Sequence, residues 1–317
     1  MGITNIRKFD TLATAFCLGS LLFWSMASIF IKYLAGFIDS WTQNVLRYSA
    51  ACLFWLPFLL FSVKTKRLDH KVWRRAIVPA AANIIMQSLW ASIMYYIDPA
   101  FASLLIQSSV IWISVFSLIL FAEERMLVGS GRFWAGMGLS VIGVVGVLCF
   151  KEDFAAHKTI IGVSIALTNA FMGAVYAVSA KIAFKNIDSR SGFSVISIYT
   201  LAGLFILAVM FGNLQECTSM GIKPWVAVVV SGVLCIALSH VFFYSAIKRL
   251  GATIHSLVML LSPFIVLAVS NIVFGESLNG FQWLFGTILL IGAALAIWSQ
   301  QHLSPGSNNK IDPIEKA

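Results

Sequence analysis

Long apolar runs of about 20 residues alternate with short polar segments along almost the whole chain. The runs lack the apolar–polar alternation of barrel strands, and each is long enough to cross a bilayer as a helix. Because lipid cannot hydrogen-bond backbone groups, the pattern predicts transmembrane helices. We expect ten of them, at residues 11–34, 41–63, 73–97, 101–121, 131–150, 159–183, 191–212, 224–247, 252–274 and 279–300.

Composition supports an all-α polytopic membrane protein. Of the 317 residues, 59% are hydrophobic and 11% are charged, and the mean hydropathy of +0.89 lies outside the range of soluble domains. The net charge of +9 is spread over short loops, so a lipid bilayer is expected as partner and nucleic acid is not. The five cysteines are isolated and lie mostly in apolar runs, so neither a cofactor nor a metal is expected.

The loop charges predict an orientation. Lys and Arg gather in the loops on the side of the N-terminus, and the loops on the other side keep only Lys151, Lys158 and Lys223. Positive loops stay in the cytoplasm. We therefore expect a multi-pass protein of the cell inner (plasma) membrane, with both termini cytoplasmic.

The second half of the chain repeats the first. The fourth run, SLLIQSSVIWISVFSLILFAEE, matches the ninth, SLVMLLSPFIVLAVSNIVFGE, in one register. Each half has five spans, and because five is odd the second half must enter the membrane from the opposite side, as an inverted repeat. The equivalent positions are Lys32 and Lys181, Ser103 and Ser256, and Glu123 and Glu276.

These features together resemble the drug/metabolite transporter (DMT) superfamily, and specifically its EamA-type transporters. A Lys closes spans one and six, a Glu follows spans four and nine, and the resemblance covers roughly residues 12–300. It implies two inverted five-helix repeats, a cavity between them and alternating access of one substrate. The first half reads AEER before an LVGSGR insert, so either Glu123 or Glu124 is the counterpart of Glu276.

The expected organisation follows from the spans and the repeat. A cytoplasmic N-terminus (1–10) precedes the first EamA-type repeat (11–150), and a periplasmic loop (151–158) connects it to the second repeat (159–300). The last residues, 301–317, are polar and contain Pro, Gly and Asn, which predicts a disordered cytoplasmic tail.

Polar side chains within the spans mark a candidate binding site, because they cost free energy in hydrocarbon and usually face the protein interior. Arg47 could hold a carboxylate or phosphate, or could instead reach out to headgroups. Asn83, Gln87 and Trp90 follow at spacing i, i+4 and i+7, which suits either a small polar substrate or interhelical amide bonds. Their counterparts on the eighth span are Ser239, His240 and Tyr244.

Other residues suggest proton coupling, or gating of the two entrances. His240 and His255 could exchange protons near neutral pH, or could be packing residues with satisfied hydrogen bonds. Lys32 and Lys181 could line the two entrances, or reach for headgroups at helix ends. Pro263 predicts a bend in the ninth span only, because its first-half counterpart is Val110.

Small residues and tryptophans are assigned scaffold roles. Trp24 and seven other tryptophans are expected mainly as headgroup anchors. A stripe of small residues permits close helix packing, and could also form the face of a homodimer. The stripe contains Gly136, Ser140, Gly143 and Val147 in the fifth span, and Gly286, Gly292 and Ala293 in the tenth.

The expected function is secondary or facilitated transport of a small polar metabolite, such as an amino acid, its derivative or an organic anion. The sequence contains no HExxH motif and no Gly-rich GK[ST] loop, so neither metalloprotease chemistry nor ATP hydrolysis is expected. The alternative is a channel-like or non-transporting scaffold protein, because no motif identifies the substrate.

Overall fold

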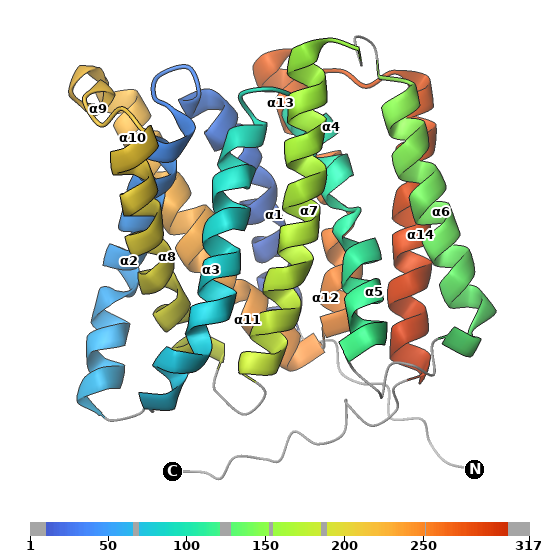
Figure 1. Cartoon of the computed structure of the whole chain (residues 1–317), viewed down its shortest axis with the longest axis horizontal. Coiled ribbons are helices and arrows are strands. Elements are labelled where there is room, and N and C mark those ends of the chain that lie inside the picture. The colour runs from blue at the N-terminus through green and yellow to red at the C-terminus, as the bar shows by residue number, and fades with distance from the viewer. Residues whose placement is uncertain are drawn as a thin grey trace.

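The computed structural model describes residues 11–65, 70–120, 128–151, 155–184, 189–250 and 252–303, and every regular element among them is a helix (Figure 1). The helices are α1 (Thr11–Leu34), α2 (Ser40–Lys64), α3 (His70–Ile93), α4 (Pro99–Ile106), α5 (Ser109–Leu120), α6 (Gly131–Cys149), α7 (His157–Ala183), α8 (Ser189–Phe211), α9 (Glu216–Ser219), α10 (Ile222–Gly232), the π-helical η2 (Val233–Leu238), α11 (Ser239–Leu250), α12 (Ala252–Met259), α13 (Ser262–Phe274) and α14 (Gly280–Leu303).

The described helices build ten membrane-spanning segments, as predicted. Three spans are composite: α4 and α5 form the fourth, α10, η2 and α11 the eighth, and α12 and α13 the ninth. We call the face where α1 begins and α14 ends the terminal face, at the bottom of Figure 1, and the opposite face the distal face. Five spans belong to each half, so α1 and its counterpart α7 run in opposite directions.

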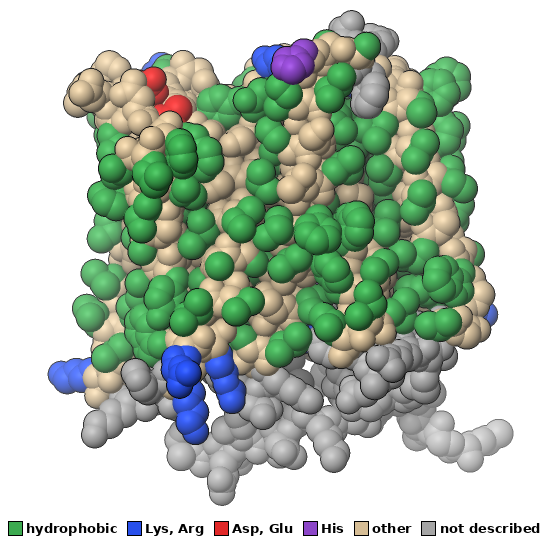
Figure 2. Space-filling model, viewed as in Figure 1, with side chains coloured by type: hydrophobic (Ala, Val, Ile, Leu, Met, Phe, Trp, Pro, Cys, Tyr) green, Lys and Arg blue, Asp and Glu red, His purple; other side chains and the backbone are tan. Residues whose placement is uncertain are grey.

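An apolar belt surrounds the molecule between these faces. In Figure 2 the middle of the visible side is covered by hydrophobic side chains, and charged side chains lie near its upper and lower edges. Large apolar residues such as Leu53, Ile206 and Ile272 are more than half exposed in the absence of lipid. A surface of this kind requires a bilayer around it, so the chain is a multi-pass membrane protein.

The fourth and ninth spans are interrupted at equivalent positions of the repeat. The breaks fall at Gln107–Ser108 and at Leu260–Leu261. In the ninth span, Pro263 has no N–H to donate to the carbonyl of Met259 four residues earlier. The prediction of a bend in the ninth span alone is therefore wrong, because both repeats carry one.

The break in the fourth span forms without proline. The amide of Gln107 bonds the carbonyl of Leu104, and the amide of Val110 bonds the carbonyl of Gln107. These bonds reach three residues back, so the chain tightens into a 3₁₀-like turn between α4 and α5. Sequence patterns offer no strong signal for such a turn.

The small-residue stripe joins the two halves within one chain. Gly136 and Gly143 on α6 face Gly292 and Leu289 on α14, so closely that a Cβ on Gly143 would lie 2.5 Å from the Leu289 amide nitrogen. Small residues permit this approach of the two backbones. Because α14 already occupies the stripe, this surface is not free to form the predicted dimer face.

We predict that Gly143→Ala lowers the free energy of unfolding by about 1–3 kcal/mol, because the new methyl group collides with the α14 backbone. Gly138→Ala on the same helix is the matched control, because a Cβ there has nothing within 4 Å. Thermal denaturation of the purified variants measures the difference. Equal melting temperatures for the two variants would contradict this account of the α6–α14 contact.

Candidate functional site: a central cavity between the repeats

A cavity of about 550 Å³ lies at the centre of the helix bundle. Both repeats contribute to its wall, and the two helix breaks border it through Gln107 and Leu260. Its volume is in the range of small-molecule sites. The predicted residues that line it are Arg47, Gln87, Trp90, His240 and His255.

Arg47 on α2 is a buried cation beside this cavity. Its side chain is 2% exposed, and its Nε donates a hydrogen bond of 3.0 Å to the Ser231 hydroxyl on α10. Its two terminal nitrogens form no hydrogen bond with a described residue, and no described carboxylate lies within ion-pair distance of them. Since Arg47 lines the cavity, its guanidinium has donors available there for an anion.

The predicted polar stripe on α3 divides between two environments. Gln87 and Trp90 line the cavity, and Gln87 forms no hydrogen bond with a described residue. Asn83 lies one turn away and is absent from the cavity wall; its amide donates to Thr200 Oγ1 at 2.9 Å on α8. The amide of Asn83 thus serves an interhelical contact, while that of Gln87 is available to a ligand.

The two histidines lie next to aromatic side chains of the cavity wall. His255 Nε2 lies 2.8 Å from Ser20 Oγ, whose own hydrogen goes to the Cys17 carbonyl. The Nε2 atom must therefore carry the hydrogen, which leaves Nδ1 as an acceptor. His240 donates from Nδ1 to the Ile236 carbonyl. Tyr244 belongs to α11, but its side chain lies outside the described part of the structure, so its predicted role remains a prediction.

Trp24 corrects a sequence prediction. Instead of anchoring at a membrane surface, it lines the cavity from the middle of α1. Its ring centroid lies 5.0 Å from that of Phe243 and 5.5 Å from that of His240. An indole in the middle of a span, next to Ser20 and Ser25 on a buried face, was the available signal for this position.

Gln107 also lines the cavity and was missed by the sequence analysis. Its Nε2 donates a long hydrogen bond of 3.5 Å to the carbonyl of Met259, which Pro263 leaves without its helical partner. The two breaks therefore support each other across the repeat boundary. A glutamine at the centre of an apolar run was the signal that could have found it.

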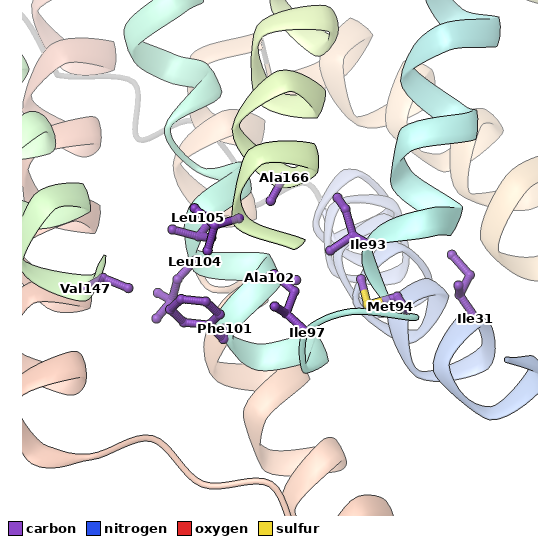
Figure 3. Packing of buried hydrophobic residues seen from close by; sticks show 11 residues of the cluster. Ile31, Ile93, Met94, Ile97, Phe101, Ala102, Leu104, Leu105, Val147 and Ala166 are labelled. Atoms are coloured by element: carbon purple, nitrogen blue, oxygen red, sulfur yellow. The ribbon is translucent and has the colours of Figure 1, made fainter. Parts of the chain in front are cut away.

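An apolar cluster packs near the distal ends of α1, α3, α6 and α7 and along α4 (Figure 3). Its side chains come from these helices and from the α3–α4 connection, and extend in a row from Val147 on α6 to Ile31 on α1. Ile93, Met94 and Phe101 are at most 1% exposed. No water-filled path can pass through such a packed layer, so the cluster closes this part of the distal side.

A carboxylate from the second repeat fastens the same region. Glu276 follows α13 and accepts hydrogen bonds from the backbone amides of Ala100 at 2.9 Å and Phe101 at 3.3 Å, at the start of α4. Burial raises the pKa of Glu276 above its ordinary value, although hydrogen bonds from Ser270 and from these amides oppose the rise. Asp98, the N-cap of α4, makes no capping bond.

Lys32 and Lys181 lie outside the cavity wall. Lys32 pairs with Asp98 at 3.2 Å on the distal face, where both side chains are partly exposed. Lys181 lies near the end of α7 at the terminal face, and its side chain is exposed. An exposed ion pair contributes about 0–1 kcal/mol, so Lys32 adds little to the closure.

The two ends of the cavity differ. At the distal end, α4 packs directly on α13, whereas the described residues of α5 and α12 form no comparable contact at the terminal end. The wall reaches toward the terminal face through His255 and Ile297. The structure is thus closed distally, with its cavity displaced toward the terminal side.

Comparisons with known proteins agree with this architecture. The EamA-like transporter family matches residues 11–149 and 160–298, one copy per repeat. An uncharacterized transporter of Clostridium kluyveri is 22% identical over 95% of both chains. Another, of Archaeoglobus fulgidus, is 22% identical over 89% of this chain and 96% of its own.

One solved crystal structure shares the fold, with a TM-score of 0.61 at 16% identity over 90% of this chain and 96% of its own. At this identity the likeness concerns the fold alone. The family match covers both halves of the chain, one copy per half, and agrees with the ten spans. The chain belongs to the EamA-like transporter family.

Proposed function

We propose that the chain is a secondary or facilitated carrier, and not an enzyme, which moves a small polar metabolite across the inner membrane by alternating access. The observation that carries the proposal is Arg47, a guanidinium buried in a closed-ended cavity without a described counter-charge. A cation in this setting requires an anionic ligand to offset its desolvation. An amino acid, its derivative or an organic anion would supply the carboxylate.

The proposed site consists of Arg47, Gln87, Trp90 and His240, with His255 as a proton-coupling or hydrogen-bonding group. Arg47 would bind the carboxylate in bidentate fashion, while Gln87 offers both a donor and an acceptor. Two indoles and Phe243 would cover apolar parts of the substrate. Asn83, Lys32 and Lys181 are left out of this site because they do not line the cavity.

Charge supports a cytoplasmic terminal face. The described Lys and Arg residues of that face are more numerous than those of the distal side, which are Lys32, Lys151, Lys158 and Lys223; those of the terminal face include Lys64, Lys71, Arg74, Arg75, Arg132, Lys181 and Arg249. This distribution follows the positive-inside rule. The cavity would then be displaced toward the cytoplasm, which is one end state of alternating access.

We predict that Arg47→Ala reduces counterflow in proteoliposomes at least tenfold, and that Gln87→Ala raises the KM severalfold. Loss of a charge-assisted hydrogen bond costs about 1.5–3 kcal/mol, which corresponds to a tenfold or larger effect. The assay uses a panel of labelled amino acids, organic acids, nucleosides and amines.

Asn83→Ala is the comparison variant. It removes the hydrogen bond to Thr200 outside the cavity and should lower the melting temperature with an unchanged KM. Wild-type rates in folded Arg47→Ala and Gln87→Ala would refute the site. Linear, unsaturable flux would instead favour a channel, and no flux of any compound would favour a scaffold protein.

The distal contacts are proposed to form a gate that opens in the other end state. Glu276 joins the second repeat to the start of α4, so the opening of this side requires its bonds to Ala100 and Phe101 to separate. The inverted repeat assigns the equivalent role at the terminal face to Glu123 or Glu124, which lies outside the described residues.

We predict that Glu276→Ala exposes the cavity to the distal side. The loss of two bonds to a carboxylate, each about 1.5–3 kcal/mol, should increase the open population about tenfold or more. Cys235 lines the cavity and reports this opening once Cys17, Cys52, Cys149 and Cys217 are changed to Ser. An impermeant thiol reagent applied to the distal face measures the rate of its labelling.

Glu276→Gln keeps one oxygen acceptor and should have a smaller effect. If Glu276→Ala were labelled from the distal face at the wild-type rate, the carboxylate would not be part of the gate.

A further inference from the structure

The cavity has an unbalanced charge. Its described lining contains one side chain that is always cationic, Arg47, and no Asp or Glu. His240 and His255 contribute no negative charge in either protonation state. The ion pair between Lys32 and Asp98 lies at the distal face and does not contribute to the wall. The protein groups of the wall thus carry at least one positive charge without a described partner.

Most of the remaining wall is apolar or aromatic. Trp24, Trp90, Phe243 and Met259 supply large surfaces of this kind. Several polar groups of the wall are already used inside the protein. The Ser103 hydroxyl donates to the Ala100 carbonyl at 2.8 Å, and the amides of Asn169 and Gln107 donate to the carbonyls of Met86 and Met259.

A charged amine would be poorly accommodated. An ammonium group is strongly hydrated and needs three acceptors, preferably with a counter-charge. The amide oxygens of Gln87, Gln107 and Asn169 can accept hydrogen bonds, but they carry no net charge. A zwitterion would therefore place a second cation in the same cavity as Arg47, where the low dielectric strengthens their repulsion.

A ligand with a carboxylate and no amine suits both the unbalanced positive charge and the aromatic wall of the cavity. It offsets the charge of Arg47, so that the loaded site gains no second cation, and its body covers the aromatic wall. We infer that the preferred substrate is an amphipathic organic monoanion, with one carboxylate, an apolar body and no charged amine. This inference rests on the proposed carrier function and narrows it, because it ranks amino acids below their deaminated counterparts.

Two matched series of compounds test the inference. The aromatic series is 3-phenylpropanoate, phenylalanine and phenethylamine, and the aliphatic series is 4-methylpentanoate, leucine and 3-methylbutylamine. Within each series the body is constant, and only the charged groups change. Binding to the purified full chain is measured by calorimetry, because the uncharged forms of these apolar acids and amines, unlike the polar compounds of the flux panel, cross lipid without a carrier.

We expect the monoanion of at least one series to bind at least tenfold more tightly than its amino acid, and the amine not to bind. Equal or tighter binding of the amino acid overturns the inference and leaves the carrier proposal intact. Failure of both monoanions to bind a folded chain also overturns it. Binding without saturable counterflow of any compound would instead count against the carrier function.

Three variants connect the preference to named residues. Arg47→Met should abolish the preference, and Arg47→Lys should retain part of it, because Lys keeps the charge without the bidentate geometry. Gln87→Glu adds a carboxylate at a side chain that forms no hydrogen bond with a described residue. It should reduce the preference for the monoanion over the amino acid at least fivefold, and an unchanged ratio in this folded variant would contradict the charge argument.

Discussion

A backbone carbonyl or amide inside the hydrocarbon must find its partner within the protein, and the two interrupted spans depend on this requirement. Pro263 removes the partner of the Met259 carbonyl, and Gln107 from the opposite repeat replaces it at 3.5 Å. Both breaks border the cavity, through Gln107 and Leu260, and the Met259 carbonyl finds its partner inside the protein. The same constraint that forces the chain into helices therefore places its irregular backbone at the centre.

The distal closure depends on a related requirement. The first amides of α4 have no helical partner, and the N-cap Asp98 leaves them without a side-chain cap. Glu276 from the second repeat provides this cap, so the end of the ninth span is attached to the start of the fourth. The packed cluster around Phe101 then seals the region between this attachment and the cavity. The carboxylate oxygens of Glu276 therefore both cap α4 and hold the distal side closed.

The fold could be predicted from the sequence because length and hydropathy are strong signals in lipid. Ten apolar runs, two matching halves and an odd number of spans per half led to the observed arrangement. The interruption at Gln107 could not be predicted, because no proline marks it and its turn follows from tertiary contacts. The sequence shows Pro263, but it does not show that the Met259 carbonyl accepts a hydrogen bond from Gln107.

The candidate site was predictable in part, because helical spacing identifies a face but not the neighbour of that face. Gln87 and Trp90 meet the cavity, whereas Asn83, one turn away, meets Thr200 on α8. Trp24 is the converse case. A tryptophan in an apolar run is usually interpreted as a headgroup anchor, and only its depth within the span shows that it lies elsewhere. Arg47 left two interpretations open in the sequence, an anion site or a side chain that reaches out to headgroups, and its burial against Ser231 distinguishes them.

In the proposed carrier, Arg47 holds the anionic group of the substrate inside this cavity. The most direct measurement is a crystal structure of the protein with 3-(4-bromophenyl)propanoate, in which the anomalous signal of bromine locates the ligand. The account predicts the carboxylate within about 3 Å of the terminal nitrogens of Arg47 and the bromine among the aromatic side chains of the cavity. A ligand bound elsewhere, or a carboxylate of the protein itself paired with Arg47, would contradict it.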